Sequence, residues 1–157
     1  MSLSFEAQPL SLPAAAPDGA ATARPRYIYR GLAEAELPLL NELYNDYYRC
    51  RRPLEEAQWL YGANPGGKAL IYAAFDEGGA LAGMRPAIPF KLYWRGEERT
   101  AYEFADALVA VRHRNRGIFS HLVKLICKQD AQEDFTLYSS ANENSLSVYR
   151  GTNRLRV

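Results

Sequence analysis

The short basic segment from Arg114 to Gly117 contains residue types that bind phosphate groups. Gly117 lets the backbone approach a phosphate closely, and Asn115 is one of the few non-glycine residues that tolerate a left-handed conformation. Arg114 and Arg116 add charge-assisted hydrogen-bond donors. Together these residues suit a diphosphate, although an ordinary basic turn before a helix would have the same letters.

The segments on either side of this loop predict a strand and a helix. Apolar residues from Leu108 to Val111 precede the loop and have the composition of a strand. After the loop, apolar residues recur at helical spacing: Ile118, Phe119, Leu122, Val123 and Ile126. A loop between a strand and a helix directs the N–H groups of the first helical turn at a single anion. This position supports a phosphate site more strongly than the letters of the loop do.

The remaining patterns predict one mixed α/β domain behind a flexible leader. Prolines break every helix in residues 1–25, which we expect to be mobile, and residues 26–157 are expected to form the folded domain. The predicted order is βααβββαβαβ. Strands are expected at residues 27–29, 68–77, 81–94, 99–111, 135–139 and 154–157, and helices at 37–52, 54–61, from 118 onward and at 143–150. Because Pro86 and Pro89 lack a backbone donor, the third strand is expected to be an edge strand or to contain a bulge.

The composition predicts a soluble protein without a global charge preference. Nineteen Lys and Arg against eighteen Asp and Glu give a formal net charge of +1, so no overall field favours nucleic acid or an anionic membrane. An anion site therefore has to be local. Cys50 and Cys127 lie on separate predicted helices without a metal-binding spacing, so we expect no metal site. No apolar run approaches the about 20 residues that span a bilayer, and no signal peptide is evident, which predicts a cytoplasmic protein.

Two motifs resemble the GNAT acetyltransferase superfamily. The acetyl-CoA loop of that superfamily reads Arg or Gln, two residues, Gly, one residue, Gly or Ala, and here the corresponding letters run from Arg114 to Phe119. Phe119 departs from the last position, and Asn115 replaces a frequent Gly. The second motif, from Asn142 to Ser145 with Tyr149 after it, resembles the superfamily's Asn, two residues, Ser, three residues, Tyr.

The resemblance covers residues 26–157 and implies a GNAT-like fold. The stretch with Trp59, Tyr61 and Asn64-Pro65 also looks like one branch of the superfamily. The implied fold class is α/β (α+β), with a central mixed, mostly antiparallel sheet flanked by helices. Members usually continue with two strands after the last helix, whereas this chain ends at Val157, so we expect an incomplete C-terminal strand pair. That expectation leaves three alternatives: a shortened chain, a homodimer through the C-terminal sheet edge, or a domain that tolerates an open edge. We favour the first two over a stable open monomer.

The resemblance also implies acetyl-CoA as the co-substrate and assigns residues to its parts. The loop and the first residues of the helix would bind the pyrophosphate: Arg114, Asn115, Arg116, Gly117, Ile118 and Phe119. The pantetheine arm would take hydrogen bonds from the main chain of Leu108, Val109 and Val111, with Asn142 and Ser145 close to it.

Acetyl transfer needs a base for the amine and an acid for the departing thiolate. Tyr149 falls where the superfamily commonly carries its general acid, and a phenol is protonated at neutral pH. Glu103 lies where several relatives carry a base, and Asp106 is the competing carboxylate. Side chains alternate along a strand, so at most one of the two should face the cleft unless a bulge intervenes. His113 and His121 are expected on the solvated side and outside the catalytic set.

The expected function is N-acetyl transfer from acetyl-CoA to a primary amine of a small molecule or peptide. A close alternative uses a longer acyl-CoA or an acyl-carrier protein, because a basic surface suits an acidic carrier as well as a diphosphate. A different class of function is a CoA-binding or interaction module that keeps the fold without turnover.

Overall fold

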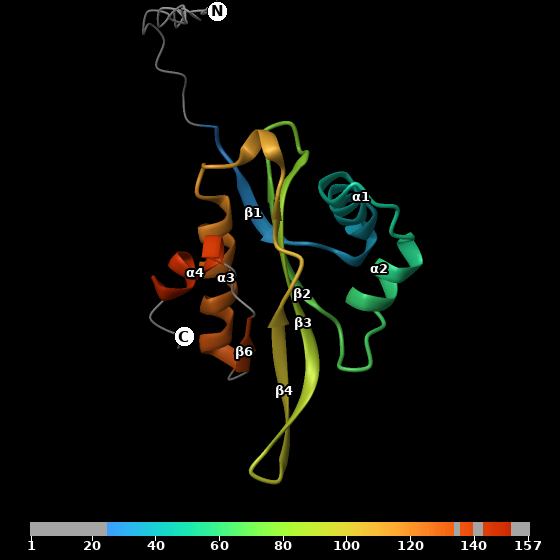
Figure 1. Ribbon diagram of the computed structural model, residues 1–157, viewed down its shortest axis with the longest axis vertical. Helices are drawn as coiled ribbons and strands as arrows, with labels where there is room; N and C mark the ends of the chain where they lie inside the picture. The colour runs from blue at the N-terminus through green and yellow to red at the C-terminus, as the bar shows by residue number, and fades with distance from the viewer. Residues whose placement is uncertain (1–24, 134–135, 140–142, 152–157) are drawn as a thin grey trace, which may run out of the picture.

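A mixed sheet with helices on both faces makes up the described part of the chain (Figure 1). The computed structural model describes residues 25–133, 136–139 and 143–151. The elements are β1 (Ile28–Gly31), α1 (Leu37–Tyr48), α2 (Leu54–Tyr61), β2 (Leu70–Phe75), β3 (Leu81–Trp94), β4 (Glu97–Phe104), β5 (Leu108–Val109), α3 (Ile118–Glu133), β6 (Thr136–Tyr138) and α4 (Glu143–Arg150). Two single 3-10 turns, Glu34–Glu36 and Val111–His113, precede α1 and the loop before α3.

The sheet is mostly antiparallel, as the sequence predicts. Its strand order is β1-β2-β3-β4-β6, and β5 pairs with β3 beside the end of β4. Only the pairing of β4 with β6 is parallel among the described strands. The helix between β5 and β6 therefore returns the chain to the edge of the sheet.

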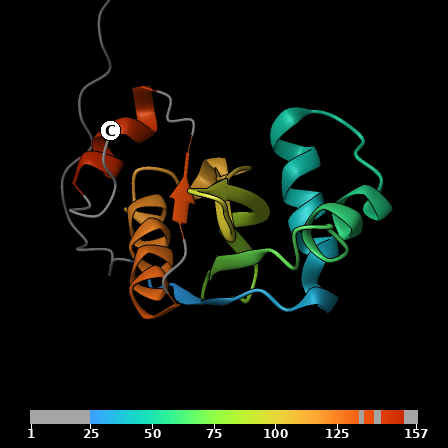
Figure 2. The ribbon, with the colours of Figure 1, turned by 90° about the horizontal axis from the view of Figure 1, so that it is seen from below.

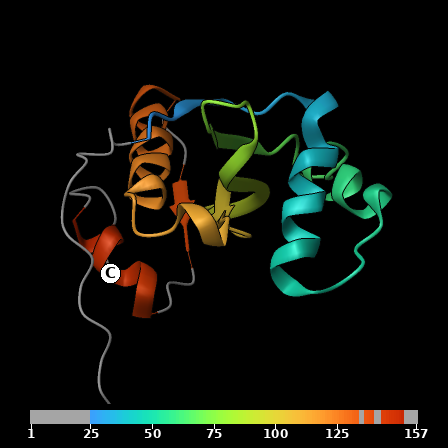
Figure 3. The same cartoon turned by 90° about the horizontal axis from the view of Figure 1, so that it is seen from above.

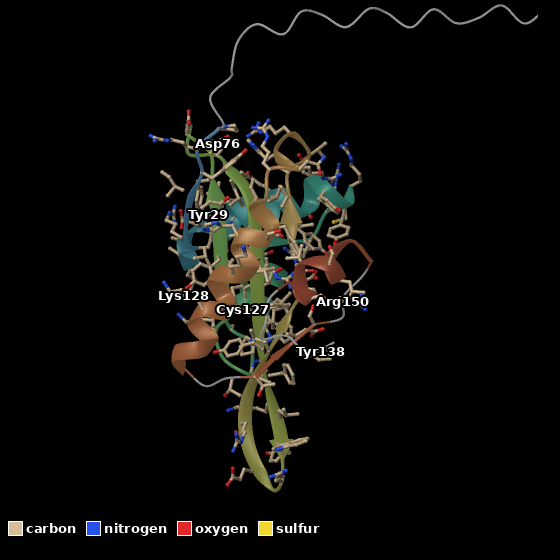
Figure 4. The ribbon with its side chains drawn as sticks, turned by 90° about the vertical axis from the view of Figure 1, so that its left-hand side faces the viewer. Tyr29, Asp76, Cys127, Lys128, Tyr138 and Arg150 are labelled. Atoms are coloured by element: carbon tan, nitrogen blue, oxygen red, sulfur yellow. The ribbon has the colours of Figure 1, made fainter. Side chains whose placement is uncertain are left out.

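The helices divide between the two faces of the sheet. The views along the long axis show α1 and α2 on one face and α3 and α4 on the other (Figures 2 and 3). Each face buries its own apolar cluster, with Leu40 and Met84 fully buried on the α1 face and Val123 and Ile126 on the α3 face. Figure 4 views the α3 and α4 face, where Cys127 of α3 is buried.

The predicted strand at 99–111 is wrong as a single element. Strand β4 ends at Phe104, β5 occupies only Leu108–Val109, and Val111 begins a 3-10 turn. Between the two strands, Asp106 adopts a φ of 48°, in the left-handed region that does not continue a strand. The chain thus leaves the ladder at residues 105–107 and rejoins the sheet as β5, a strand of only two residues.

Of the two expectations for the third strand, the edge position is wrong, because β3 lies in the middle of the sheet. Its pairing with β2 does contain a register shift, a bulge or irregularity between Ala74 and Phe75. Pro86 pairs with Ile71 of β2 but lies between the residues that pair with β5 and those that pair with β4. Pro89 pairs with Tyr102 of β4 and lies beyond Ala87, the β3 residue that ends the pairing with β2. Each proline can therefore turn its missing donor toward a side of β3 without a ladder partner.

Some predictions fall outside the described residues. These are the strand at 154–157, the leader up to residue 24 and Asn142. In the part of the chain that the structure describes, no helix has the length and apolar character needed to cross a bilayer.

Adjacent leucines of α1 provide a matched test of the α1 core. Leu40 is 0% exposed and Leu39 is 41% exposed. Leu40→Ala should lower the free energy of unfolding by about 2–5 kcal/mol, because it leaves a cavity under the helix. Leu39→Ala should cost about 1 kcal/mol or less. Urea denaturation of both variants measures the difference, and equal losses would contradict the described packing of α1.

Candidate functional site

A cavity of about 780 Å³ opens where β4 breaks away from the ladder. It lies between the end of α1, the break at residues 105–107, the loop before α3, and α4. The cavity brings together these predicted site residues: Glu103, Val109, Arg114, Asn115, Arg116, Gly117, Ile118, Phe119, Ser145 and Tyr149. Residues predicted from three separate stretches of sequence therefore share one space.

Two predicted residues lie elsewhere, and a third is outside the described residues. The Leu108 side chain is buried in the core on the α1 face, so only its main chain can serve a ligand in the cavity. Val111 is 73% exposed and lines a neighbouring cavity of about 880 Å³ between α1 and the turn after β2. Asn142 is the residue that the structure does not describe.

The loop before α3 has the backbone of an anion site. Asn115 and Gly117 adopt φ values of 60° and 76°, the left-handed conformation for which their residue types are suited. Helix α3 starts at Ile118, and its earliest helical hydrogen bond runs from the His121 N–H to the Gly117 carbonyl. The N–H groups of residues 118–120 precede that bond, so they have no acceptor within the helix. A Cβ built on Gly117 would meet no atom within 4 Å, so the space beside the loop is open.

Aromatic and acidic side chains hold the basic residues around this loop. The Arg114 guanidinium lies 5.2 Å from the centre of the Tyr47 ring, a cation–π contact. Arg116 donates to the Tyr27 hydroxyl at 3.3 Å. Arg112 lies 3.5 Å from the Asp76 carboxylate. Arg114 and Arg116 are exposed and line this cavity, whereas Arg112 lines the neighbouring one.

The prediction that His113 lies on the solvated side is wrong. His113 is 8% exposed, and its Nδ1 lies 3.0 Å from the Tyr27 hydroxyl. Burial, followed by the charge of neighbouring Arg112, lowers the pKa of His113. The imidazole therefore connects Tyr27, the residue before β1, to the 3-10 turn that precedes the loop. His121 is exposed as predicted and stacks on Tyr29, with ring centres 3.9 Å apart.

A network from the first two helices holds the break in the strand. The Tyr61 hydroxyl donates to the Asp106 carboxylate at 2.6 Å, and Arg52 lies 3.6 Å from the same oxygen. Arg52 also donates to Asn41 at 2.8 Å and lies 3.6 Å from the centre of the Tyr44 ring. Burial, followed by the charge of Asp106, raises the pKa of Tyr61 well above its usual value. Nothing in the local sequence around Asp106 predicted this network.

The break also places both candidate carboxylates at one cavity. Glu103 and Asp106 would face opposite ways along a regular strand, but both line this space because the chain leaves the strand after Phe104. The Glu103 side chain is exposed there, whereas Asp106 is held by Tyr61 and Arg52. Glu103 is therefore accessible to a ligand in the cavity, whereas the Asp106 carboxylate is already engaged by Tyr61 and Arg52.

At the inner end of the cavity, Tyr149 meets an arginine that the sequence did not single out. Tyr149 is 3% exposed on α4, and its hydroxyl accepts a hydrogen bond from Arg85 of β3. The tyrosine ring packs against Phe104 and Phe119, each with its ring centre 6.1 Å away. The signal in the sequence was the single arginine within the otherwise apolar run from Leu81 to Phe90.

A metal centre has no obvious ligand set here. Among the described residues, no group of three or more His, Cys, Asp and Glu side chains is placed to hold a metal ion. Within the same residues, Cys50 is exposed and Cys127 is buried.

Comparison with known proteins points to one family. The family described as "Acetyltransferase (GNAT) domain" matches residues 28–143. No curated protein matches the sequence. An acetyltransferase of Trypanosoma brucei is similar in structure, with 17% identity, a TM-score of 0.68, and coverage of 84% of this chain and 94% of that one. An aminoglycoside 6'-N-acetyltransferase of Acinetobacter baumannii has 17% identity, a TM-score of 0.62, and coverage of 83% and 92%.

A third similar structure is glucosamine-6-phosphate N-acetyltransferase of Arabidopsis thaliana. It has 14% identity, a TM-score of 0.62, and coverage of 84% of this chain and 95% of that one. At such identities these structures are evidence for the fold alone. The evidence for the family is the match over residues 28–143, which is more than half of the chain.

The network around the break makes a stability prediction. Tyr61→Phe should lower the free energy of unfolding by about 1–3 kcal/mol, because it removes a buried hydroxyl that donates to Asp106 and accepts from Arg52. Tyr93→Phe is the control, since the Tyr93 hydroxyl donates to Glu98 from a side chain that is 71% exposed. Urea denaturation of both variants measures the two losses. A Tyr61 variant as stable as the control would show that the network does not hold the break.

Proposed function

The chain belongs to the family of acetyltransferase (GNAT) domains, and we propose on that basis that it transfers the acetyl group of acetyl-CoA to a primary amine of a small molecule or peptide. The observation that supports this proposal is the shared cavity, which the loop before α3, the break after β4 and Tyr149 all line. The loop, as the proposed anion site, and Tyr149, as the proposed proton donor, face one space, and transfer from acetyl-CoA requires both.

The loop is the proposed site of the coenzyme pyrophosphate. The N–H groups at the start of α3 have no helical acceptor, and the positive end of the helix dipole adds to them. Arg114 and Arg116 would supply charge-assisted donors, and the open space beside Gly117 would let the phosphate reach the backbone.

The short strand β5 is the proposed site of the pantetheine arm. Within the described residues β5 pairs only with β3, so its other edge has main-chain groups without a ladder partner. Leu108, Val109 and Val111 are the residues we assign to these hydrogen bonds, with Asn142 and Ser145 near the same arm. An extended amide chain along an open strand edge is bound in the same way as a further strand.

The proposed reaction is a direct attack in a ternary complex. Glu103 accepts the proton of the amine, because it is exposed at the cavity while Asp106 is held by Tyr61 and Arg52. The amine nitrogen forms a bond to the acetyl carbon, and the bond from that carbon to sulfur breaks. Tyr149 gives its hydroxyl proton to the departing thiolate.

The proposal extends to the setting of the enzyme. We assign acyl-CoA binding to the domain of residues 26–157, with the protein in the cytoplasm. We also propose a homodimer through the C-terminal sheet edge. Strand β6 lies at that edge and pairs only with β4 among the described strands, which is the geometry that strand addition uses.

Tyr149→Phe tests the acid and the activity together. The wild type should release free thiol from acetyl-CoA when primary amines are added, and the variant should lower kcat by about 10²- to 10⁴-fold. The affinity for acetyl-CoA should stay within about threefold, because only the hydroxyl is lost. Thiol release and calorimetric titration measure the two quantities. If the wild type bound acetyl-CoA without releasing thiol for any amine in a broad panel, the proposed transfer would be wrong.

Gly117→Asp tests the loop. The variant should weaken acetyl-CoA binding by about tenfold or more, which is about 1.4 kcal/mol, because a carboxylate would occupy and repel the phosphate position. Gly96→Asp is the matched control, since Gly96 also has a positive φ of 84° and open space beside it. Both variants carry the same backbone strain, and only one lies at the loop. Equal affinities in the two proteins would contradict the assignment.

A further inference from the structure

Arg85 is a buried cation at the inner end of the cavity. Arg85 is 3% exposed and lines the cavity together with Tyr149. Its guanidinium donates to the Tyr149 hydroxyl, and its Nε is buried with no hydrogen-bond partner in the described part of the chain. Among the same residues it forms no ion pair with a carboxylate. The polar contact of this guanidinium is thus directed at one phenolic oxygen.

Aromatic rings surround the rest of the guanidinium. Its central carbon lies 4.2 Å from the centre of the Phe104 ring, 5.3 Å from that of Phe119 and 5.4 Å from that of Tyr149. These contacts offset part of the cost of removing a cation from water. Burial lowers the pKa of Arg85, and Tyr149 opposes that shift. A methionine would fill such a space without this cost, so packing alone does not account for an arginine here.

We infer that Arg85 is a positioning residue that orients and activates Tyr149 as the proton donor, an inference that rests on the proposed function. A guanidinium has no acceptor, so the Tyr149 oxygen must accept in this contact. The phenolic O–H then has to point away from Arg85. Tyr149 also lines the cavity, so its side chain lies beside the space that a ligand would occupy.

The same contact stabilises the charge that forms during transfer. When the O–H bond of Tyr149 breaks and an S–H bond forms on the departing thiol, negative charge develops on the phenolic oxygen. A cationic donor already in place at that oxygen stabilises this charge without rearrangement. Arg85 stays protonated throughout. The proton that Glu103 takes from the amine passes to water, and water restores the Tyr149 proton after the products leave.

A double-mutant cycle tests this inference. Arg85→Met should lower kcat by about 10- to 100-fold while the KM for acetyl-CoA stays within about threefold. In the Tyr149→Phe background the same substitution should change kcat by less than about twofold, because the group through which it acts is gone. Arg85→Lys should recover part of the loss, since it keeps a cationic donor. The measurement is steady-state thiol release for the four proteins of the cycle and the lysine variant.

The opposite results are equally specific. An equal loss of kcat from Arg85→Met in both backgrounds would mean that Arg85 acts through packing and not through Tyr149. An unchanged kcat would also overturn the inference. Urea denaturation of each variant accompanies the assay. If Arg85→Met did not fold, the cycle would be repeated with Arg85→Lys and Arg85→Gln, and equal rates for these two would overturn the inference.

A second measurement separates this inference from the proposed function. Nitrogen-15 spectra of the free protein report whether the Nη groups of an arginine are held by a hydrogen bond, whatever the enzyme turns over. We expect restrained Nη signals for Arg85 that are lost in Tyr149→Phe. Unchanged signals would show that the contact is absent. Restrained signals together with a wild type that turns over no amine would place the failure in the proposed function, and the assignment of Arg85 to acid catalysis would fall with it.

Discussion

The hydrogen bond from Tyr61 to Asp106 is the interaction on which the candidate site depends. It holds the chain away from the ladder at residues 105–107, and the cavity opens at that point. Arg52 contacts the same carboxylate from the connection between α1 and α2, and Tyr61 is the last residue of α2. The carboxylate is partly buried and the hydroxyl and guanidinium are buried, so removing one of the three groups leaves a polar partner without compensation. The packing of α1 and α2 on the sheet thereby keeps one edge of β5 open.

Positive charge reaches this cavity in two different environments. Arg114 and Arg116 lie at the exposed loop, where Arg114 contacts the Tyr47 ring and Arg116 donates to the Tyr27 hydroxyl. Arg85 lies inside, where one hydroxyl and three aromatic rings replace water. The formal net charge of the chain is only +1, so this distribution is a property of the site and not of the whole protein. The proposed anion site and the proposed proton donor thus lie at different parts of one cavity.

Prediction from the sequence was accurate where a few neighbouring residues decide the outcome. The helix at 54–61 and the strand at 81–94 have the predicted bounds, and the left-handed conformation of Asn115 follows from its residue type. Prediction failed at the strand break, because the Ala-Asp-Ala of residues 105–107 contains neither Gly nor Pro. The partner that holds Asp106 lies 45 residues earlier in the chain. The central place of β3 was missed because a proline removes the backbone donor at only one position and toward only one neighbouring strand. The rest of the strand can still pair on both sides.

The sequence by itself determined the order of the elements apart from the break in the strand at 99–111, the position of the loop and its left-handed residues, and the two motifs that resemble the family. These depend on periodicity, turn residues and spacing, which act over a few residues. Only the tertiary structure decided that Glu103, the loop and Tyr149 share one cavity, that His113 is buried, and that Arg85 meets Tyr149. The reason is physical, since Arg85 and Tyr149 are 64 residues apart and meet only because α4 packs near β3, a central strand of the sheet. Burial turns an ordinary arginine into a directed donor, and burial is a property of the folded chain.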